Sequence, residues 1–134
     1  MERDNAIDIE IRVRYAEVDA MGAVHHSRYW VWFEMGRTEL LRSHGIAYAD
    51  LEREGVFFVV AKCAAKFAAP ARYDDVLVLH TEITRMGAAR IDHAYQLRRN
   101  ADGAVLATAE TTLACVDRAG RIIPIPDDMR APKP

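Results

Sequence analysis

Asp19 and two adjacent histidines, His25 and His26, form the group of residues in this sequence best suited to chemistry. A carboxylate can attack a carbonyl carbon, or it can take a proton from water as a base. Ser27 and the apolar residues that follow it predict a helix from about residue 28, with Ser27 as its N-cap. The first N–H groups of a helix lack intrahelical acceptors and carry partial positive charge, so they can polarise a carbonyl oxygen.

Each of these residues also has a simpler structural interpretation. Asp19 could cap a turn, since Asp does this often in loops. Tyr15 is placed on the core face by the strand before it, where it could bond to Asp19 or a substrate, or act only as a core residue. His25 could be a solvent-facing loop residue. Two histidines and one carboxylate, with no cysteine nearby, do not predict a metal site.

A long helix over residues 28–44 is predicted to follow, with Gly45 as the residue that ends it. Its first half, Tyr29 to Met35, is apolar on nearly every side, which predicts burial all round. Gly36 costs about 1 kcal/mol relative to alanine inside a helix, so we expect close approach of another element, for example a partner subunit.

Glu34 and Arg37 lie three residues apart on this helix, a spacing that predicts an ion pair. The helix therefore combines buried aromatic residues with a polar pair at mid-length. Trp30 and Phe33 are expected to be core residues, although one of them could line a pocket for an acyl group.

The rest of the sequence predicts strands. Residues 7–14 alternate apolar and polar side chains, and a short helix is expected over residues 48–54. Later strands are expected over 57–67, 76–86, 90–99 and 105–116, with the turn residues 100–103 between the last two. This order predicts an α+β fold in which about five antiparallel strands curl around the long helix. An open sheet has edges, so dimerisation through an edge is expected.

The composition excludes several classes of protein. The chain of 134 residues is 51% hydrophobic and 28% charged, with net charge −2, which predicts one globular domain with its core in about residues 7–120 and no nucleic-acid partner. No apolar run reaches 18 residues and the start lacks the apolar segment of a signal peptide, so we expect a soluble cytoplasmic protein with no membrane span. Cys63 and Cys115 are expected to be buried free thiols.

A set of residues around the predicted helix gives a more specific indication, namely Tyr15, Asp19, Gly22, Val24, His26, Tyr29, Glu34 and Arg37. With these spacings, the sequence resembles the hotdog-fold acyl-CoA thioesterases of the 4-hydroxybenzoyl-CoA thioesterase type, including the Tol-Pal-associated short-chain branch. The later stretch FFVVAKCAAKFAAPARYDD also resembles the family's second strand and the turn that follows it. The resemblance covers about residues 7–120.

The resemblance implies hydrolysis of an acyl-CoA thioester to a free acid and CoA. It assigns Asp19 the role of nucleophile or general base, and it assigns the backbone N–H of His26 to the carbonyl oxygen. In the short-chain branch, a histidine at this position also has a side-chain role. No cofactor is implied, since CoA is part of the substrate, and the site is expected between protomers of a homodimer or homotetramer.

The expected substrate contacts extend over the whole domain. Arginine side chains near the later turns could bind the phosphates of CoA, and residues of the loop, helix and first long strand could surround the acyl group. The candidates are Gly22, Val24, Tyr29, Val59, Val60, Arg85 and Arg90. The sequence leaves the acyl group itself open.

Two other functions remain possible at this point. The first is an acyl-thioester hydratase or dehydratase, a class that usually has a histidine five positions after its Asp. Here the spacings from Asp19 are six and seven, which disfavours it. The second is a non-catalytic acyl-thioester-binding protein of the same fold, which the presence of Asp19 disfavours.

Overall fold

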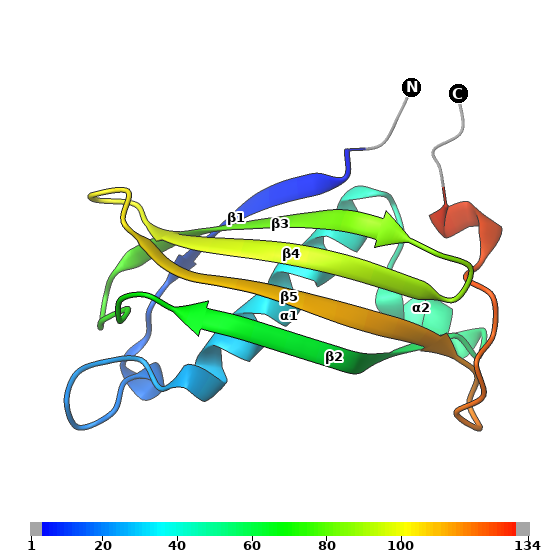
Figure 1. The fold of residues 1–134 in the computed structure, drawn as a ribbon, viewed down its shortest axis with the longest axis horizontal. Helices are drawn as coiled ribbons and strands as arrows, with labels where there is room; N and C mark the ends of the chain where they lie inside the picture. Colours follow the sequence, from blue (N-terminus) through cyan, green and yellow to red (C-terminus); the bar gives the residue numbers. More distant parts are fainter. Residues whose placement is uncertain (1–3, 131–134) are drawn as a thin grey trace.

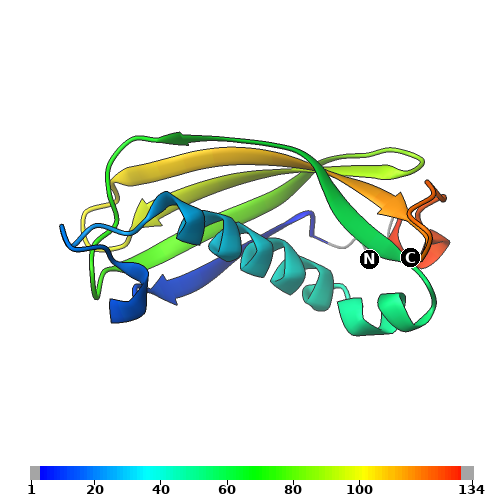
Figure 2. The same cartoon turned by 90° about the horizontal axis from the view of Figure 1, so that it is seen from below.

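The computed structural model describes residues 4–130 and contains one five-stranded antiparallel sheet with a long helix against one face (Figures 1 and 2). The strand order is β1-β3-β4-β5-β2, and every neighbouring pair is antiparallel. The strands are β1 (Ala6–Arg12), β2 (Phe57–Phe67), β3 (Val76–Met86), β4 (Arg90–Arg99) and β5 (Val105–Val116). The predicted α+β arrangement is therefore confirmed.

The long helix α1 (His26–Ser43) crosses the sheet diagonally (Figure 1), and the short helix α2 (Tyr48–Arg53) follows it (Figure 2). The prediction that Ser27 caps α1 is wrong. The cap is His25, whose Nδ1 accepts a hydrogen bond of 3.2 Å from the Ser27 N–H, so the helix begins at His26. Gly45 follows the end of the helix with φ of +82°, as the sequence predicts. Neither helix among the described residues is long and apolar enough to cross a membrane.

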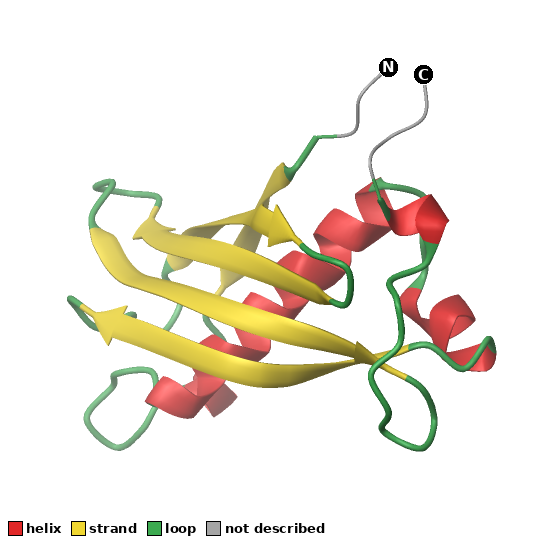
Figure 3. Cartoon of the chain, turned by 45° about the vertical axis from the view of Figure 1, so that its right-hand side comes forward, coloured by secondary structure: helices red, strands yellow, loops and turns green. Residues whose placement is uncertain are grey.

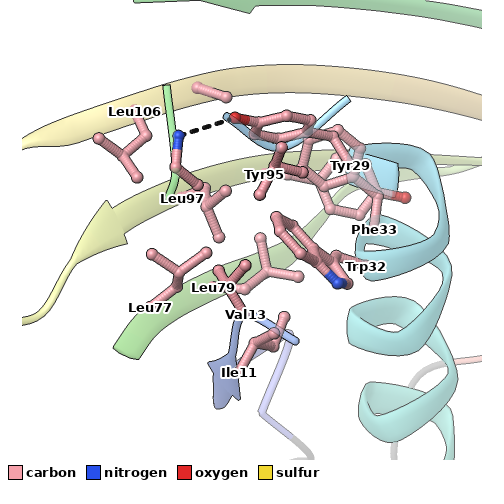
Figure 4. Close-up of a cluster of buried hydrophobic side chains, with 13 residues drawn as sticks. Ile11, Val13, Tyr29, Trp32, Phe33, Leu77, Leu79, Tyr95, Leu97 and Leu106 are labelled. Atoms are coloured by element: carbon pink, nitrogen blue, oxygen red, sulfur yellow. Dashed lines mark hydrogen bonds between the residues drawn. The ribbon is translucent and has the colours of Figure 1, made fainter. Parts of the chain in front are cut away.

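The helix is buried on one side only. Tyr29, Phe33 and Leu40 face the sheet and are at most 3% exposed, whereas Val31 and Met35 remain 48% and 43% exposed. The expectation of burial on all sides is therefore wrong for one chain, because a single sheet covers only one side of a helix. Figure 4 shows how the helix aromatics pack on side chains from the strands.

Gly36 lies where α1 comes closest to β3. A Cβ atom at this position would overlap the Thr81 hydroxyl and come within 2.8 Å of Leu79 Cδ2. The element that requires glycine is therefore a strand of the same chain rather than a partner subunit.

The predicted ion pair between Glu34 and Arg37 is not formed among the described residues. Instead, Arg37 Nη1 donates a hydrogen bond of 3.3 Å to the Tyr95 hydroxyl. Tyr95 lies on β4, so this contact ties the middle of the helix to the sheet.

Strand β2 is an edge of the sheet, paired only with β5. Its side chains are largely exposed, including Val59 at 47% and Val60 at 50%. Cys63 is exposed as well, which corrects the expectation of a buried thiol, because α1 does not cover this edge. Cys115, on the inner strand β5, is buried as predicted.

Candidate active site

The loop that carries Asp19 is folded back on itself before the helix. Val18 and Val24 form an antiparallel bridge, and the Asp19 N–H donates to the Ala23 carbonyl at 2.8 Å. Gly22 has φ of +81°, a conformation that glycine adopts without strain, and this allows the sharp turn. The bridge holds residue 19 opposite residue 23, and residue 23 lies three positions before the first residue of the helix.

The two carboxylate oxygens of Asp19 have different roles. Oδ1 accepts hydrogen bonds from the N–H groups of Met21 and Ala23, at 2.8 and 3.3 Å. Oδ2 has no hydrogen-bond partner among the described residues, and the side chain is exposed. Asp19 therefore caps a turn with one oxygen and leaves the other open to a substrate or to water.

The start of α1 provides an unused donor beside this loop. His26 is the first helical residue, and its N–H donates to no group within residues 4–130. His26 begins a helix of 18 residues, so the partial positive charge of the helix start is available here. The His26 ring lies 4.2 Å from the His25 ring and 6.5 Å from the Phe67 ring, measured between centroids.

Two buried hydrogen bonds fix the start of the helix against the rest of the chain. The Tyr29 hydroxyl accepts from the Ala71 N–H at 3.1 Å (Figure 4). The indole N–H of Trp32 donates to Glu17 Oε2 at 3.1 Å, and this carboxylate is only 4% exposed. Tyr29, named from the sequence as a substrate contact, is thus a buried anchor, as is Val24, which is 7% exposed.

Glu17 is a positioning residue that sequence reasoning missed. Burial raises its pKa, but hydrogen bonds from the Arg14 N–H and guanidinium and from Trp32 offset this and hold the pKa below its ordinary value. Glu17 remains ionised and joins the helix to the segment before Asp19. A carboxylate and a tryptophan fifteen residues apart give no recognisable signal in the sequence.

Tyr15 does not occupy the predicted place. The strand ends at Arg12, and residues Tyr15–Glu17 form a single turn of 3-10 helix, so the alternation of the strand no longer applies. The Tyr15 ring is 77% exposed and packs edge-on against Tyr73 at 5.6 Å. No hydrogen bond joins Tyr15 to Asp19 among the described residues.

The two arginines proposed for CoA lie at the other end of the sheet. Arg85 and Arg90 flank the β3–β4 hairpin, opposite the end where α1 begins (Figure 1). Arg90 Nη2 donates to Asp92 Oδ2 at 2.9 Å. One chain therefore does not bring these arginines to Asp19.

A cavity of about 240 Å³ lies between the C-terminal half of α1, helix α2 and the sheet. Its lining includes Glu34, Arg37, Phe58, His93 and Leu113. His93 is 5% exposed, and burial together with the charge of Arg37 lowers its pKa to about 4. Sequence reasoning found no group around His93, although its alternation with Ile91 and Tyr95 on the strand would have placed it inside.

Known proteins resemble this chain over most of its length. The thioesterase-like superfamily model matches residues 13–132. The acyl-CoA thioester hydrolase YbgC of Escherichia coli is 40% identical over 80% of this chain and 79% of its own. The acyl-CoA thioesterase YbgC of Haemophilus influenzae is 35% identical over 96% of this chain and 94% of its own.

The fold agrees with the sequence matches. The crystal structure of a probable thioesterase from Bartonella henselae superimposes with a TM-score of 0.85 and 33% identity, over 90% of this chain and 99% of that one. The five-stranded sheet with α1 against it is thus the hotdog arrangement that the sequence predicted. The chain belongs to the thioesterase-like superfamily and is an enzyme of the thioesterase class.

Proposed function

We propose that this enzyme hydrolyses an acyl-CoA thioester to a free acid and CoA, with Asp19 and the His26 N–H as its reacting pair. The observation that carries this is the free Oδ2 of Asp19 on a loop that leads directly into an unused N–H at the start of an 18-residue helix. The names of the relatives in Escherichia coli and Haemophilus influenzae support an acyl-CoA substrate.

The chemistry requires a centre that attacks and a donor that holds the oxygen. With the thioester carbonyl against the His26 N–H, negative charge that develops on the oxygen is stabilised by this donor and by the helix dipole. One such donor contributes about 2.7 to 4 kcal/mol to the transition state. It is a backbone group, so the identity of the side chain at residue 26 matters less than the position of the helix.

Asp19 can act by either of two balanced routes. As a base, it takes a proton from water while the water oxygen bonds to the carbonyl carbon. The C–S bond then breaks, and the thiolate of CoA leaves and is protonated. As a nucleophile, Oδ2 displaces the thiolate to form an anhydride, which water then hydrolyses to regenerate Asp19.

We further propose that the site is completed by a second copy of the chain, paired through β2. A two-fold axis perpendicular to the sheet pairs identical edge strands in antiparallel orientation. The Phe67 end of one β2, which contacts His26 and Tyr29, then approaches the Phe57 end of the other. This arrangement brings the start of one α1 towards the partner's cavity, and it gives Val59, Val60, Arg85 and Arg90 a route to the substrate.

Hydrolysis is tested by thiol release from a panel of acyl-CoA esters. We expect release from at least one ester by the wild type, and loss of this activity in Asp19→Ala. If the wild type releases no thiol from any ester, or Asp19→Ala retains full activity, the proposal is wrong. Hydration of crotonyl-CoA without thiol release would instead indicate a hydratase.

The dimer is tested by light scattering coupled to size exclusion. We expect at least twice the 15.1 kDa mass of the chain at micromolar concentration. Val60→Glu on the β2 edge should shift the mass to that of the monomer and reduce activity. Ile122→Glu is the matched control, since Ile122 is 65% exposed and belongs to none of the five strands, with a single bridge to Val116 at the end of β5. A wild type that is fully active as a monomer would disprove the shared site.

A further inference from the structure

The segment that follows β5 folds back towards the cavity. The Ile123 N–H donates to the Cys115 carbonyl at 3.0 Å, and the Ile125 N–H donates to the Ala88 carbonyl at 2.9 Å. The residues Asp127–Met129 then form a single 3-10 turn, η2, at the end of the sheet where β3 and β4 join (Figure 1). The segment lies after residue 120, so it is an addition to the range that the sequence predicts for the core.

Met129, the last residue of η2, forms part of the cavity wall. It is 6% exposed and lines the cavity together with Met86 and Ile91, which stand on either side of the β3–β4 turn. Met129 and Ile91 belong to one buried apolar cluster, and Met86 packs against it. These three side chains carry no N–H or O–H group, so this wall of the cavity suits hydrocarbon.

Hydrogen bonds on both sides of Met129 along the chain hold it in this wall. Before it, the Ile125 N–H is bonded to the Ala88 carbonyl. After it, Arg130 Nη2 donates to the carbonyl oxygens of Gly87 and Ala88, at 2.8 and 2.9 Å. A side chain fixed in this way excludes the atoms of a ligand that is too long, because a packed wall yields only at a cost in free energy.

The position and size of the cavity connect Met129 to the reaction. The cavity follows α1 from Glu34 to His44, or about 15 Å along the helix axis. Phe58, near the start of β2, also lines it. In the proposed dimer this end of β2 approaches the partner's helix start, so an acyl group on a carbonyl held there would enter the cavity. The volume of about 240 Å³ is below the roughly 300 to 1,000 Å³ of sites for drug-sized ligands, which suits a short acyl group.

We propose that Met129 is a specificity-determining residue, whose side chain limits the length of the acyl group that the cavity accepts. The inference rests on the proposed thioester hydrolysis and adds a class of substrate to it, acyl groups short enough to fit without displacing Met129. One methylene more or less in a fitted apolar pocket changes kcat/KM by about 10- to 200-fold, so the limit should be sharp.

The test measures kcat/KM for thiol release from straight-chain acyl-CoA esters of increasing length, from acetyl to dodecanoyl. We expect the wild type to lose about 10-fold or more between its best ester and the ester two carbons longer. Met129→Ala removes the side chain beyond Cβ, so the best ester should become one about two carbons longer. Met129→Leu nearly conserves the volume and should keep the preference of the wild type.

Two further variants separate the length limit from a general loss of packing. Ile125→Ala is the matched control, since Ile125 is 2% exposed in the same segment but is not one of the described residues that line the cavity. Arg130→Ala leaves residue 129 unchanged and removes two bonds to the β3–β4 turn, so it should weaken the limit even where Met129→Ala does not fold. If neither Met129→Ala nor Arg130→Ala changes the limit, or Ile125→Ala changes it as much, the inference is wrong.

A second measurement separates this inference from the hydrolysis itself. Calorimetry with free straight-chain carboxylic acids should show the same limit in the wild type and the same change in Met129→Ala. If the acids bind in this way but no ester is hydrolysed, the proposed function fails and the role of Met129 stands. If esters are hydrolysed but the wild type shows no length limit in either measurement, the role of Met129 is disproved and the hydrolysis stands.

Discussion

The two halves of α1 present different kinds of groups to different surroundings. At its start, the reacting candidates are exposed: Oδ2 of Asp19 and the N–H of His26 are open, and Oδ1 of Asp19 accepts from backbone N–H groups of its own loop. Along its second half, the helix faces a cavity lined also by α2 and the sheet, where His93 is buried. Figure 3 shows α2 beyond the end of α1, next to the sheet.

We infer from this difference that the start of the helix serves the reaction and that its second half serves binding. A reacting carboxylate must meet water and stay ionised, which an exposed loop allows. Recognition of a substrate is sharper in a buried site, because an unpaired polar group is costly only where water is excluded. Changes at the exposed groups of the helix start should therefore alter activity and leave stability nearly constant. Changes at buried side chains, in the first turns of the helix or along its second half, should alter stability as well.

The largest effect is expected at Asp19. Replacement by alanine should lower kcat/KM by about 10² to 10⁴, since it removes the base or nucleophile. Asp19→Asn keeps an oxygen that can accept from Met21 and Ala23, so the loop should stay folded while the activity falls by a similar factor. Thiol release and urea unfolding would be measured on both variants. If Asp19→Asn is nearly as active as the wild type, Asp19 acts only as a turn cap.

The next largest effect is expected at Gly36, in the buried region. Gly36→Ala would gain about 1 kcal/mol of helix propensity, but its Cβ overlaps the Thr81 hydroxyl. We expect a net loss of about 1 to 3 kcal/mol in the free energy of unfolding, measured in urea. In a Thr81→Ala background the hydroxyl is gone and only the flexible end of the Leu79 side chain lies within 3 Å, so the same change should cost less. Equal costs in both backgrounds would mean that the strand does not limit this position.

Burial of His93 makes the free energy of unfolding depend on pH. Its pKa is about 4 in the folded chain against 6.5 unfolded, so between these values the unfolded chain binds more protons. Stability is therefore lost as pH falls from about 6.5 towards 4. From pH 7 to pH 5, the wild type should lose about 2 kcal/mol more than His93→Phe. Urea midpoints at the two pH values would measure this, and parallel losses would contradict the burial of His93.

The sequence predicted the elements well, because strand alternation and turn residues are local signals. The strand ranges after residue 57 and the end of α1 at Gly45 agree with the structure. The prediction that Tyr15 faces the core was wrong because the strand ends before it and a 3-10 turn follows. The prediction that Cys63 is buried was wrong because the strand order places its strand at an edge of the sheet. Such properties depend on contacts between distant residues, so no local pattern carries them.

The candidate site shows the same limit. Asp19 and His26 could be named from the sequence because they lie within eight positions in one loop and helix start. The contact of Glu17 with Trp32 could not be predicted from the sequence, and neither could the place of His93 in its cavity. Each depends on packing between separate elements. The roles of all these residues in catalysis and binding remain predictions.

The smallest effect is expected at Ser27, within the exposed end of the helix. Its hydroxyl lies 2.8 Å from His25 Nδ1, but both side chains are exposed, so water can replace this bond. Ser27→Ala should change the free energy of unfolding by no more than about 0.5 kcal/mol. Tyr29→Phe, two residues later, leaves the buried Ala71 N–H unpaired and is the contrasting variant. If Ser27→Ala costs as much as Tyr29→Phe in urea, the start of α1 depends on its cap as much as on its buried anchor, and the division between exposed reactive groups and buried stabilising groups would not hold.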